Sequence, residues 1–239
     1  MSKSVALIGC SNGLGHIRRL VLIANKLAES GVEVALFAPL QSVEQVRSAL
    51  AIEKMFSAID FDTYTSAHAL CTGHHQATNW DKRLPAMSQY DVVVSDNLPE
   101  ILAIRPDAWL SGNFFWHESL PRISSDYRRR AEKLISQNRP SVLTYGPFSS
   151  IQRDEHLTIV NCSIPQPSIR RLPVEQDSLL ISCGTGGGAI ELYSHFLQSL
   201  SFNNIHPFKQ VYVEPRLVPR IHQDWLQPAD FSQTMFSRV

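Results

Sequence analysis

His16 closes a glycine-rich turn, GCSNGLGH over residues 9–16, and is the side chain best placed for chemistry. The apolar run Val5–Ile8 before the turn predicts a buried strand, and Ile17–Glu29 after it repeats apolar residues at helical spacing. Val34–Ala38 predicts the next strand. In a parallel βαβ unit such a turn lies at the carboxyl end of the strands, where open α/β sheets bind ligands. Because an imidazole titrates near neutral pH, His16 is a candidate for proton transfer at that edge.

The spacing of the glycines in the turn also suggests a different function, the binding of a dinucleotide. Gly9, Gly13 and Gly15 have the spacing of short-chain dehydrogenases, which pair the turn with a tyrosine and a lysine four residues later. None of the six tyrosines of this chain has a lysine at that position. Dinucleotide binders also need an acidic residue near the end of the second strand, and here Ala38 is followed by Pro39 and Leu40. The sequence therefore argues against nicotinamide chemistry.

Composition narrows the class of protein. The chain has 239 residues, of which 44% are hydrophobic, enough for an ordinary globular core in one large or two modest domains. Twenty-two basic residues balance 22 acidic ones, so no global field favours nucleic acid or an anionic membrane. No apolar run approaches the roughly 20 residues that span a bilayer, and the N-terminal run is too short for a signal peptide. Four scattered cysteines fit no disulfide framework, which indicates reduced thiols and a cytoplasmic protein.

Strand and helix signals alternate through the first 160 residues, as in a parallel sheet covered on both faces. Further strands are predicted at 57–62, 91–95, 108–110 and 141–145. Helices are predicted at 43–50, 99–104 and 118–136, and a long loop at 64–85. We expect a complete N-terminal Rossmann-like domain over residues 1–163.

A proline-rich stretch over residues 164–177 is the predicted linker. Beyond it the opening pattern recurs, with a strand at 178–183, a glycine-rich turn, a helix at 189–200 and a strand at 209–213. Residues 178–239 suffice for little more than one βαβ unit. We therefore expect a truncated second Rossmann-like domain, whose open sheet edge would suit a second subunit.

Three segments together resemble the GT-B glycosyltransferases, an α/β fold family with two Rossmann-like domains. Residues 13–16, GLGH before a helix, resemble the glycine loop that presents a histidine to the cleft of the N-terminal domain. Residues 91–99, DVVVSDNLP, are similar to the strand that ends in an aspartate near the acceptor. Leu179–Gly188 is similar to the turn that opens the nucleotide-sugar domain. The order and spacing of the three segments carry the resemblance.

The resemblance implies a role for each matching residue. His16 would be the base that deprotonates an acceptor hydroxyl, and Asp96 would orient its ring and stabilise the imidazolium. Backbone amides of the second turn would approach the donor diphosphate, at Gly184, Thr185, Gly186 and Gly187. The residues expected on the acceptor side are Asn12, Gly13, Gly15, Asn97, Asn113 and Trp116.

Structural roles remain open for the same residues. His16 could cap or pack at the start of its helix, and Asp96 could be a turn residue. The glycines of the second turn could serve only a tight turn with close helix packing. The aromatic run at 113–117 is as well suited to a core as to an acceptor pocket.

Three weaker patterns favour structural explanations. Asp60 and Asp62 match a metal-binding pattern that has no place in this fold. Cys71, His74 and His75 lack a second pair of zinc ligands, so no metal is expected. The arginines at 128–130 form a solvated helix face, or alternatively meet an anionic acceptor or lipid headgroup at a membrane surface.

The sequence as a whole predicts a glycosyltransferase, or the N-terminal part of one. It would move a sugar from a nucleotide-sugar, expected to be a UDP-sugar, to a hydroxyl by inverting, metal-independent displacement, without another cofactor. One alternative is a nucleotide-sugar hydrolase of the same fold. Another is a non-catalytic truncated paralogue that acts as a binding subunit, so whether this chain is an enzyme stays open.

Overall fold

The structure is a computed structural model that divides the chain into two compact units, Met1–Pro165 and Gln166–Val239. It describes residues 2–63, 80–120, 122–145, 149–151, 155–162, 177–181, 190–203, 208–213 and 226–228. The linker predicted over 164–177 lies almost entirely outside these residues, so its limits stay a prediction.

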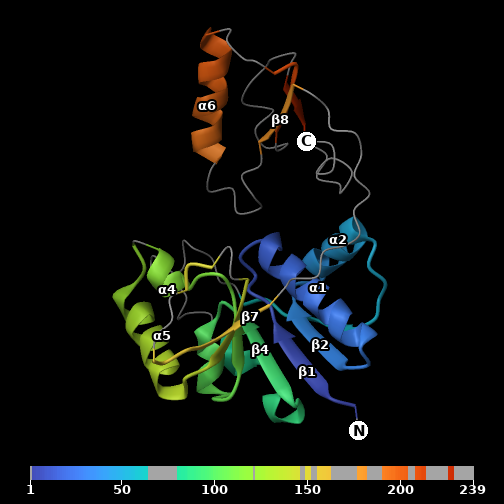
Figure 1. Cartoon of the computed structure of the whole chain (residues 1–239), viewed down its shortest axis with the longest axis vertical. Coiled ribbons are helices and arrows are strands. Elements are labelled where there is room, and N and C mark those ends of the chain that lie inside the picture. Colours follow the sequence, from blue (N-terminus) through green and yellow to red (C-terminus); the bar gives the residue numbers. More distant parts are fainter. Residues whose placement is uncertain are drawn as a thin grey trace. The chain divides into compact units, whose positions relative to one another are not determined.

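The first unit is built on a seven-stranded sheet in which every pair of neighbours is parallel (Figure 1). Its strands are β1 (Ser4–Ile8), β2 (Glu33–Ala38), β3 (Ser57–Asp60), β4 (Val92–Asp96), β5 (Trp109–Ser111), β6 (Ser141–Thr144) and β7 (Thr158–Asn161). Their order is β3-β2-β1-β4-β5-β6-β7. The order reverses direction between β1 and β4, which makes the carboxyl ends of these two strands the switch point of the sheet.

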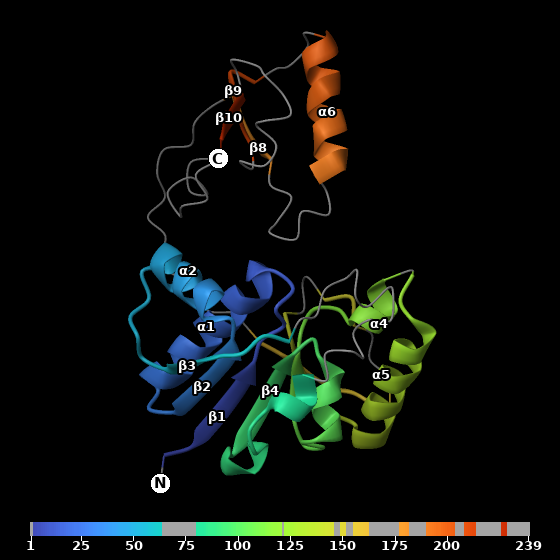
Figure 2. The ribbon, with the colours of Figure 1, turned by 180° about the vertical axis from the view of Figure 1, so that it is seen from behind.

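Alternate residues of the central strands enter two separate cores, as the two-residue period of a strand requires. Leu7 and Leu36 face α1 (Leu14–Glu29) and α2 (Leu40–Leu50), and Leu20 of α1 packs there with no exposed surface. Ile8 and Phe37 face the other side, where α5 (Ser125–Asn138) and the 3-10 turns pack. Figures 1 and 2 show α1 and α2 beside β1 and β2, and α5 at the other end of the sheet. The helices and 3-10 turns on the two faces confirm the predicted parallel sheet covered on both sides.

The helix predicted at Glu118–Ser136 is wrong, because the structure has two helices there. α4 covers Trp116–Ser119 and α5 covers Ser125–Asn138. Leu120 has an extended backbone, with φ −96° and ψ 117°. It precedes Pro121, and a proline disfavours helical backbone in the residue before it. The break ends α4 before α5 begins.

Shorter elements also differ from the prediction. The helix expected at 99–104 is the 3-10 turn η4 (Pro99–Ala103), and the expected long loop contains the 3-10 turn η2 (Trp80–Arg83). A third 3-10 turn, η3, covers Met87–Gln89. β7 was not predicted, because two of its four side chains are exposed and its apolar pattern is short.

Within its described residues, the second unit has a three-stranded parallel sheet in the order β10-β9-β8 and the helix α6 (Ile190–Asn203). The strands are β8 (Ser178–Ile181), β9 (Gln210–Val213) and β10 (Leu226–Pro228), the last of which was not predicted. Ile181, Leu197 and Val211 form its core with Val213 and Leu226. The strand–helix–strand pattern expected after the linker is confirmed.

Candidate active site

The glycine turn after β1 is built to start α1 close to the sheet. Gly13 has φ 100°, a conformation that favours glycine, and its amide donates to the carbonyl of Ser11 at 3.0 Å. Ser11 is in turn held by Thr63, because the Ser11 amide donates to Thr63 Oγ1 at 3.0 Å and the Thr63 amide donates to Ser11 Oγ at 2.9 Å. These bonds fix the first turn of α1, which carries His16, at the switch point.

His16 and Asp96 meet there although 80 positions separate them. β1 and β4 are hydrogen-bonded neighbours, and Asp96 is the last residue of β4. His16 Nδ1 lies 2.6 Å from Asp96 Oδ2. The Asp96 side chain is fully buried, whereas the His16 side chain is 12% exposed. The structure therefore joins the imidazole and carboxylate that the sequence paired by resemblance.

Two further side chains bind the other oxygen of Asp96. Arg19, one helical turn after His16 on α1, donates from Nη2 to Oδ1. Ser111, at the end of β5 and in register with Asp96, donates from Oγ to Oδ1 at 2.8 Å. Both oxygens of this buried carboxylate thus have charged or polar partners, which a buried ion requires.

The electrostatics of the cluster keep Asp96 ionised. Burial alone would raise the pKa of the Asp96 carboxyl, but Arg19, His16 and Ser111 together hold that pKa below its ordinary value. An ionised carboxylate only accepts hydrogen bonds, so His16 donates from Nδ1–H. In the neutral ring the unprotonated nitrogen is then Nε2, which is the tautomer that a base needs.

An aromatic pair borders the imidazole. The ring centroid of Trp116 lies 5.8 Å from that of His16, and the ring of Phe114 lies 6.4 Å away at 71°. Phe114 and Trp116 contact each other edge to face at 4.9 Å. Trp116, predicted on the acceptor side, is 9% exposed and belongs to the core as well as to the surroundings of His16.

The remaining predicted acceptor-side residues lie in three places. Asn12, Gly13 and Gly15 lie in and just after the turn before His16, and a Cβ added to Gly15 would have no atom within 4 Å. Asn97 follows Asp96 with φ 58°, and its buried side-chain amide group has no hydrogen-bond partner among the described residues. Asn113 is used structurally, because its Oδ1 accepts from the Tyr145 amide at 2.9 Å.

The predicted donor residues lie outside the described residues. This holds for Gly184, Thr185, Gly186 and Gly187, and equally for Cys71, His74 and His75. The described residues contain no group of three histidine, cysteine or acidic side chains arranged to hold a metal. Asp60 has a structural role, since its Oδ1 accepts from the amide of Leu40 at the start of α2 at 3.1 Å.

Two of the three arginines at 128–130 bind acidic groups of the protein. Arg129 pairs with Asp126 one turn earlier on α5, and Arg130 Nη2 lies 3.4 Å from Oδ2 of Asp81. Arg128 is exposed. The predicted solvated face therefore includes one arginine that pairs with a buried aspartate.

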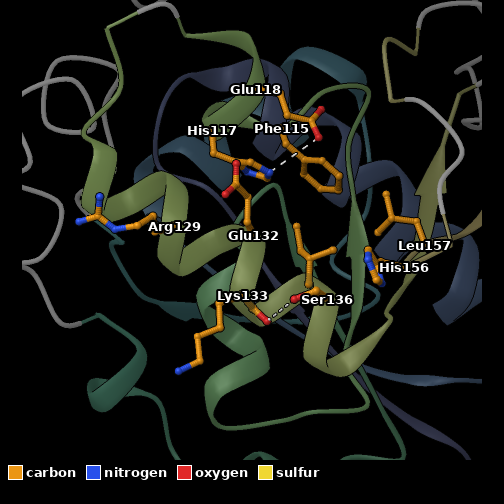
Figure 3. A pocket seen from close by; sticks show the side chains of 10 residues that line it. Phe115, His117, Glu118, Arg129, Glu132, Lys133, Ser136, His156 and Leu157 are labelled. Atoms are coloured by element: carbon orange, nitrogen blue, oxygen red, sulfur yellow. Dashed lines mark hydrogen bonds and ion pairs between the residues drawn. The ribbon is translucent and has the colours of Figure 1, made fainter.

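A second histidine lines a hollow of about 560 Å³ between α4, α5 and residues 156–157 (Figure 3). His117 Nε2 lies 3.7 Å from Glu118 Oε1, and the two side chains point toward each other. Burial, together with the positive charge of Arg128, lowers the pKa of His117 to about 4. An imidazole with that pKa is a weak proton acceptor at neutral pH. His117 is therefore a poorer candidate base than His16, whose Nδ1 lies within hydrogen-bond distance of a fully buried carboxylate.

Sequence reasoning missed Arg19 and Ser111. Arg19 lies three positions after His16, a spacing that puts two side chains on one helix face. Ser111 ends a strand next to β4, and that position could be recognised once the strand order was known. Both signals depend on Asp96 already being identified as part of the site.

No protein-family model and no curated protein sequence matches this chain. Solved structures do match its fold. CalG4, the calicheamicin glycosyltransferase, aligns over 97% of this chain and 71% of its own, with a TM-score of 0.54 and 13% identity. UGT2 of Phytolacca americana, complexed with UDP-2-fluoro-glucose and pterostilbene, aligns over 99% and 78%, with a TM-score of 0.52 and 13% identity.

Arabidopsis thaliana UGT89C1 complexed with quercetin gives the same result, with 99% of this chain and 71% of its own covered, a TM-score of 0.52 and 12% identity. The chain has the GT-B fold. This confirms the fold expected from the sequence. In the GT-B fold of this chain, His16 and Asp96 lie at the switch point of the first sheet. None of the helices in the described segments has the length and apolar character needed to cross a membrane.

Proposed function

We propose that this protein is a glycosyltransferase, or the N-terminal part of one, in which His16 deprotonates the hydroxyl of an acceptor. The nucleotide-sugar would be the donor, expected to be a UDP-sugar. The displacement would invert the anomeric carbon, since the deprotonated oxygen attacks directly as the diphosphate leaves. The observation that carries the proposal is the 2.6 Å contact between His16 Nδ1 and a fully buried, ionised Asp96.

The contact supports base chemistry in two ways. It fixes the proton on Nδ1, which leaves Nε2 of the neutral ring as the acceptor of the hydroxyl proton. It also places a negative charge beside the imidazolium that forms when the proton is taken up. Phe114 and Trp116 add an aromatic surface next to the ring, which suits an apolar or ring-shaped acceptor.

The solved structures of the same fold support this chemistry by analogy. One of them is complexed with a UDP-sugar analogue and pterostilbene, another with quercetin. For this chain we propose that the amides around Gly184–Gly187 approach the donor diphosphate and that no metal takes part. The described cysteines, Cys10 and Cys162, are free thiols, which suits the proposed cytoplasmic location.

The test is transfer by the full chain with radiolabelled UDP-sugars and a panel of small hydroxyl acceptors. We expect UDP and labelled acceptor to form together. His16→Ala should lower turnover by roughly 10²–10⁴-fold, the usual contribution of a positioned base. His195→Ala removes an exposed histidine from α6 and serves as the matched control, with unchanged turnover.

Each other outcome contradicts the proposal. Labelled free sugar that forms without an acceptor would indicate the hydrolase, with water in place of the hydroxyl. Binding of a UDP-sugar without turnover would indicate a binding subunit. Equal rates for His16→Ala and the wild type would remove His16 from the chemistry.

A further inference from the structure

Asp96 divides its two oxygens between two groups that can carry positive charge. Oδ2 faces Nδ1 of His16, and Oδ1 binds the guanidinium of Arg19 and the hydroxyl of Ser111. Arg19 Nη2 also lies 3.4 Å from His16 Nδ1. Because the proton on Nδ1 is donated to Asp96, this nitrogen has no lone pair for Arg19. The guanidinium is therefore a neighbouring cation to the imidazole, not its hydrogen-bond partner.

The charges around the Asp96 carboxylate influence how readily His16 takes up a proton before any acceptor binds. With Arg19 present, the guanidinium offsets part of the negative charge of the buried carboxylate, so Asp96 attracts a second imidazole proton less strongly. Without Arg19, the only group that can neutralise Asp96 within the pair is His16, by taking up a proton. A base that already holds its proton at rest cannot accept one from a hydroxyl.

We infer that Arg19 is a positioning residue that sets the protonation state of His16. By offsetting the charge of Asp96 and adding a cation beside the ring, Arg19 opposes the uptake of a second proton at Nε2. Its importance for catalysis rests on the proposed function, but its effect on the imidazole does not.

The other groups that face this cluster do not compensate for Arg19. Burial raises the pKa of the Cys10 thiol, next to β1, to about 12, and burial also raises the pKa of the Cys162 thiol, just after β7. Both thiols are therefore uncharged at neutral pH. The hydroxyl of Ser111 on β5 carries no charge. The carboxyl of Glu100 on η4 helps to raise the pKa of the Cys10 thiol, and it supplies no positive charge. Among the described residues, Arg19 is the permanent cation that contacts Asp96.

The experiment is an NMR titration of the histidine rings in the full chain, which needs neither donor nor acceptor. The sequence has nine histidines, and the signal of His16 is the one missing in His16→Gln. We expect Arg19→Gln to move the titration midpoint of His16 to higher pH by roughly 1–3 units, because a nearby cation is lost and the carboxylate is left to His16. Arg19→Lys keeps the charge and should stay within about half a unit of the wild type.

Arg18→Gln is the matched control, since it removes the neighbouring arginine of α1 and should leave the midpoint unchanged. A midpoint that stays or falls in folded Arg19→Gln overturns the inference. If Arg19→Gln does not fold, two variants without the buried carboxylate decide instead. The titration midpoint of His16 should be at least about one pH unit lower in Asp96→Asn than in Asp96→Asn/Arg19→Gln, because only the first variant retains the cation. Equal midpoints in these two variants overturn the inference.

Activity provides a separate readout. If the chain transfers sugar, the acid limb of the pH profile of turnover should move upward in Arg19→Gln with the NMR midpoint. A pure loss of folding or binding would not move that limb. If the chain shows no transfer at all, the proposed function fails while the titration still decides the role of Arg19.

Discussion

At the scale of single residues, the buried charge of the site is balanced by charged and polar partners. Asp96 is fully buried, and its bonds to His16, Arg19 and Ser111 use both carboxylate oxygens. Losing one partner of such a group commonly costs several kcal/mol, because an uncompensated buried charge remains. A protein interior has a low dielectric constant, so the positive charge of Arg19 also acts strongly on the nearby imidazole. The stability of the fold and the proton affinity of the imidazole therefore depend on the same charges around Asp96.

A second buried carboxyl, Glu100 of η4, behaves in the opposite way. It is 6% exposed, and burial raises its pKa to about 7 despite the nearby charge of Arg130. The folded state therefore holds this proton more tightly than the unfolded chain. The stability contributed by the protonated form is present below about pH 4.5 and is lost as the pH rises to about 7.

We expect the free energy of unfolding to fall by about 2–3 kcal/mol more in the wild type than in Glu100→Gln between pH 5 and pH 8. Urea unfolding at the two pH values measures the difference. Glu132→Gln, which removes an exposed carboxyl from α5, is the control and should follow the wild type. A parallel pH dependence in wild type and Glu100→Gln would contradict the assigned protonation.

At the scale of elements, the glycine turn shows which glycine the fold needs. A Cβ on Gly9 would lie 3.0 Å from Cδ1 of Ile17 and 3.2 Å from Cβ of Ala38. Ala38 belongs to the neighbouring strand and its Cβ cannot rotate away. Gly9 therefore allows α1 to pack closely against β1 and β2, which keeps His16 near the end of β4.

We expect Gly9→Ala to lower the free energy of unfolding by about 1–3 kcal/mol, the usual cost of an overpacked core. Gly15→Ala is the matched variant in the same turn, where no atom lies within 4 Å of the added Cβ. It should range from no effect to a gain of about 1 kcal/mol, because alanine favours the helix. Urea unfolding compares the two, and equal stabilities would show that α1 can move away from the sheet without cost.

At the scale of the whole molecule, each unit has its own hydrophobic core. The first unit has two core clusters on the two faces of its sheet, whereas five buried residues form the described core of the second. Since local stability follows buried apolar contacts, the units should open separately. The strands β1 and β4, each flanked by a strand on both sides, should be the most protected part of the chain.

Hydrogen exchange of the full chain tests this expectation. Backbone amides of β4 should exchange more slowly than those of β9. Leu197→Ala removes a fully buried side chain from the second core and should cost about 2–5 kcal/mol there. It should speed exchange in β9 and leave β4 unchanged. Faster exchange in both strands would mean that the chain unfolds as one cooperative unit.

The sequence by itself determined most of the succession of strands and helices along the first unit, and the glycine turn that carries His16. These features follow from local periodicity and from the backbone freedom of glycine, both visible in a short window. The pairing of His16 with Asp96 was also reached from the sequence, but only through the resemblance of whole segments. Where the local signal was short, as in β7, or interrupted by Pro121, the prediction failed.

The tertiary structure alone decided what surrounds Asp96. Ser111 reaches it because β5 pairs in register with β4, and Arg19 reaches it because the rotation of α1 turns one face toward the strand ends. Register and rotation are set by packing across the sheet between segments that lie up to about a hundred positions apart in the chain. Burial, which gives these charges their strength, is likewise a property of the assembled fold and not of any segment. The sequence pointed to His16 and Asp96, and folding brought Arg19 to the same carboxylate.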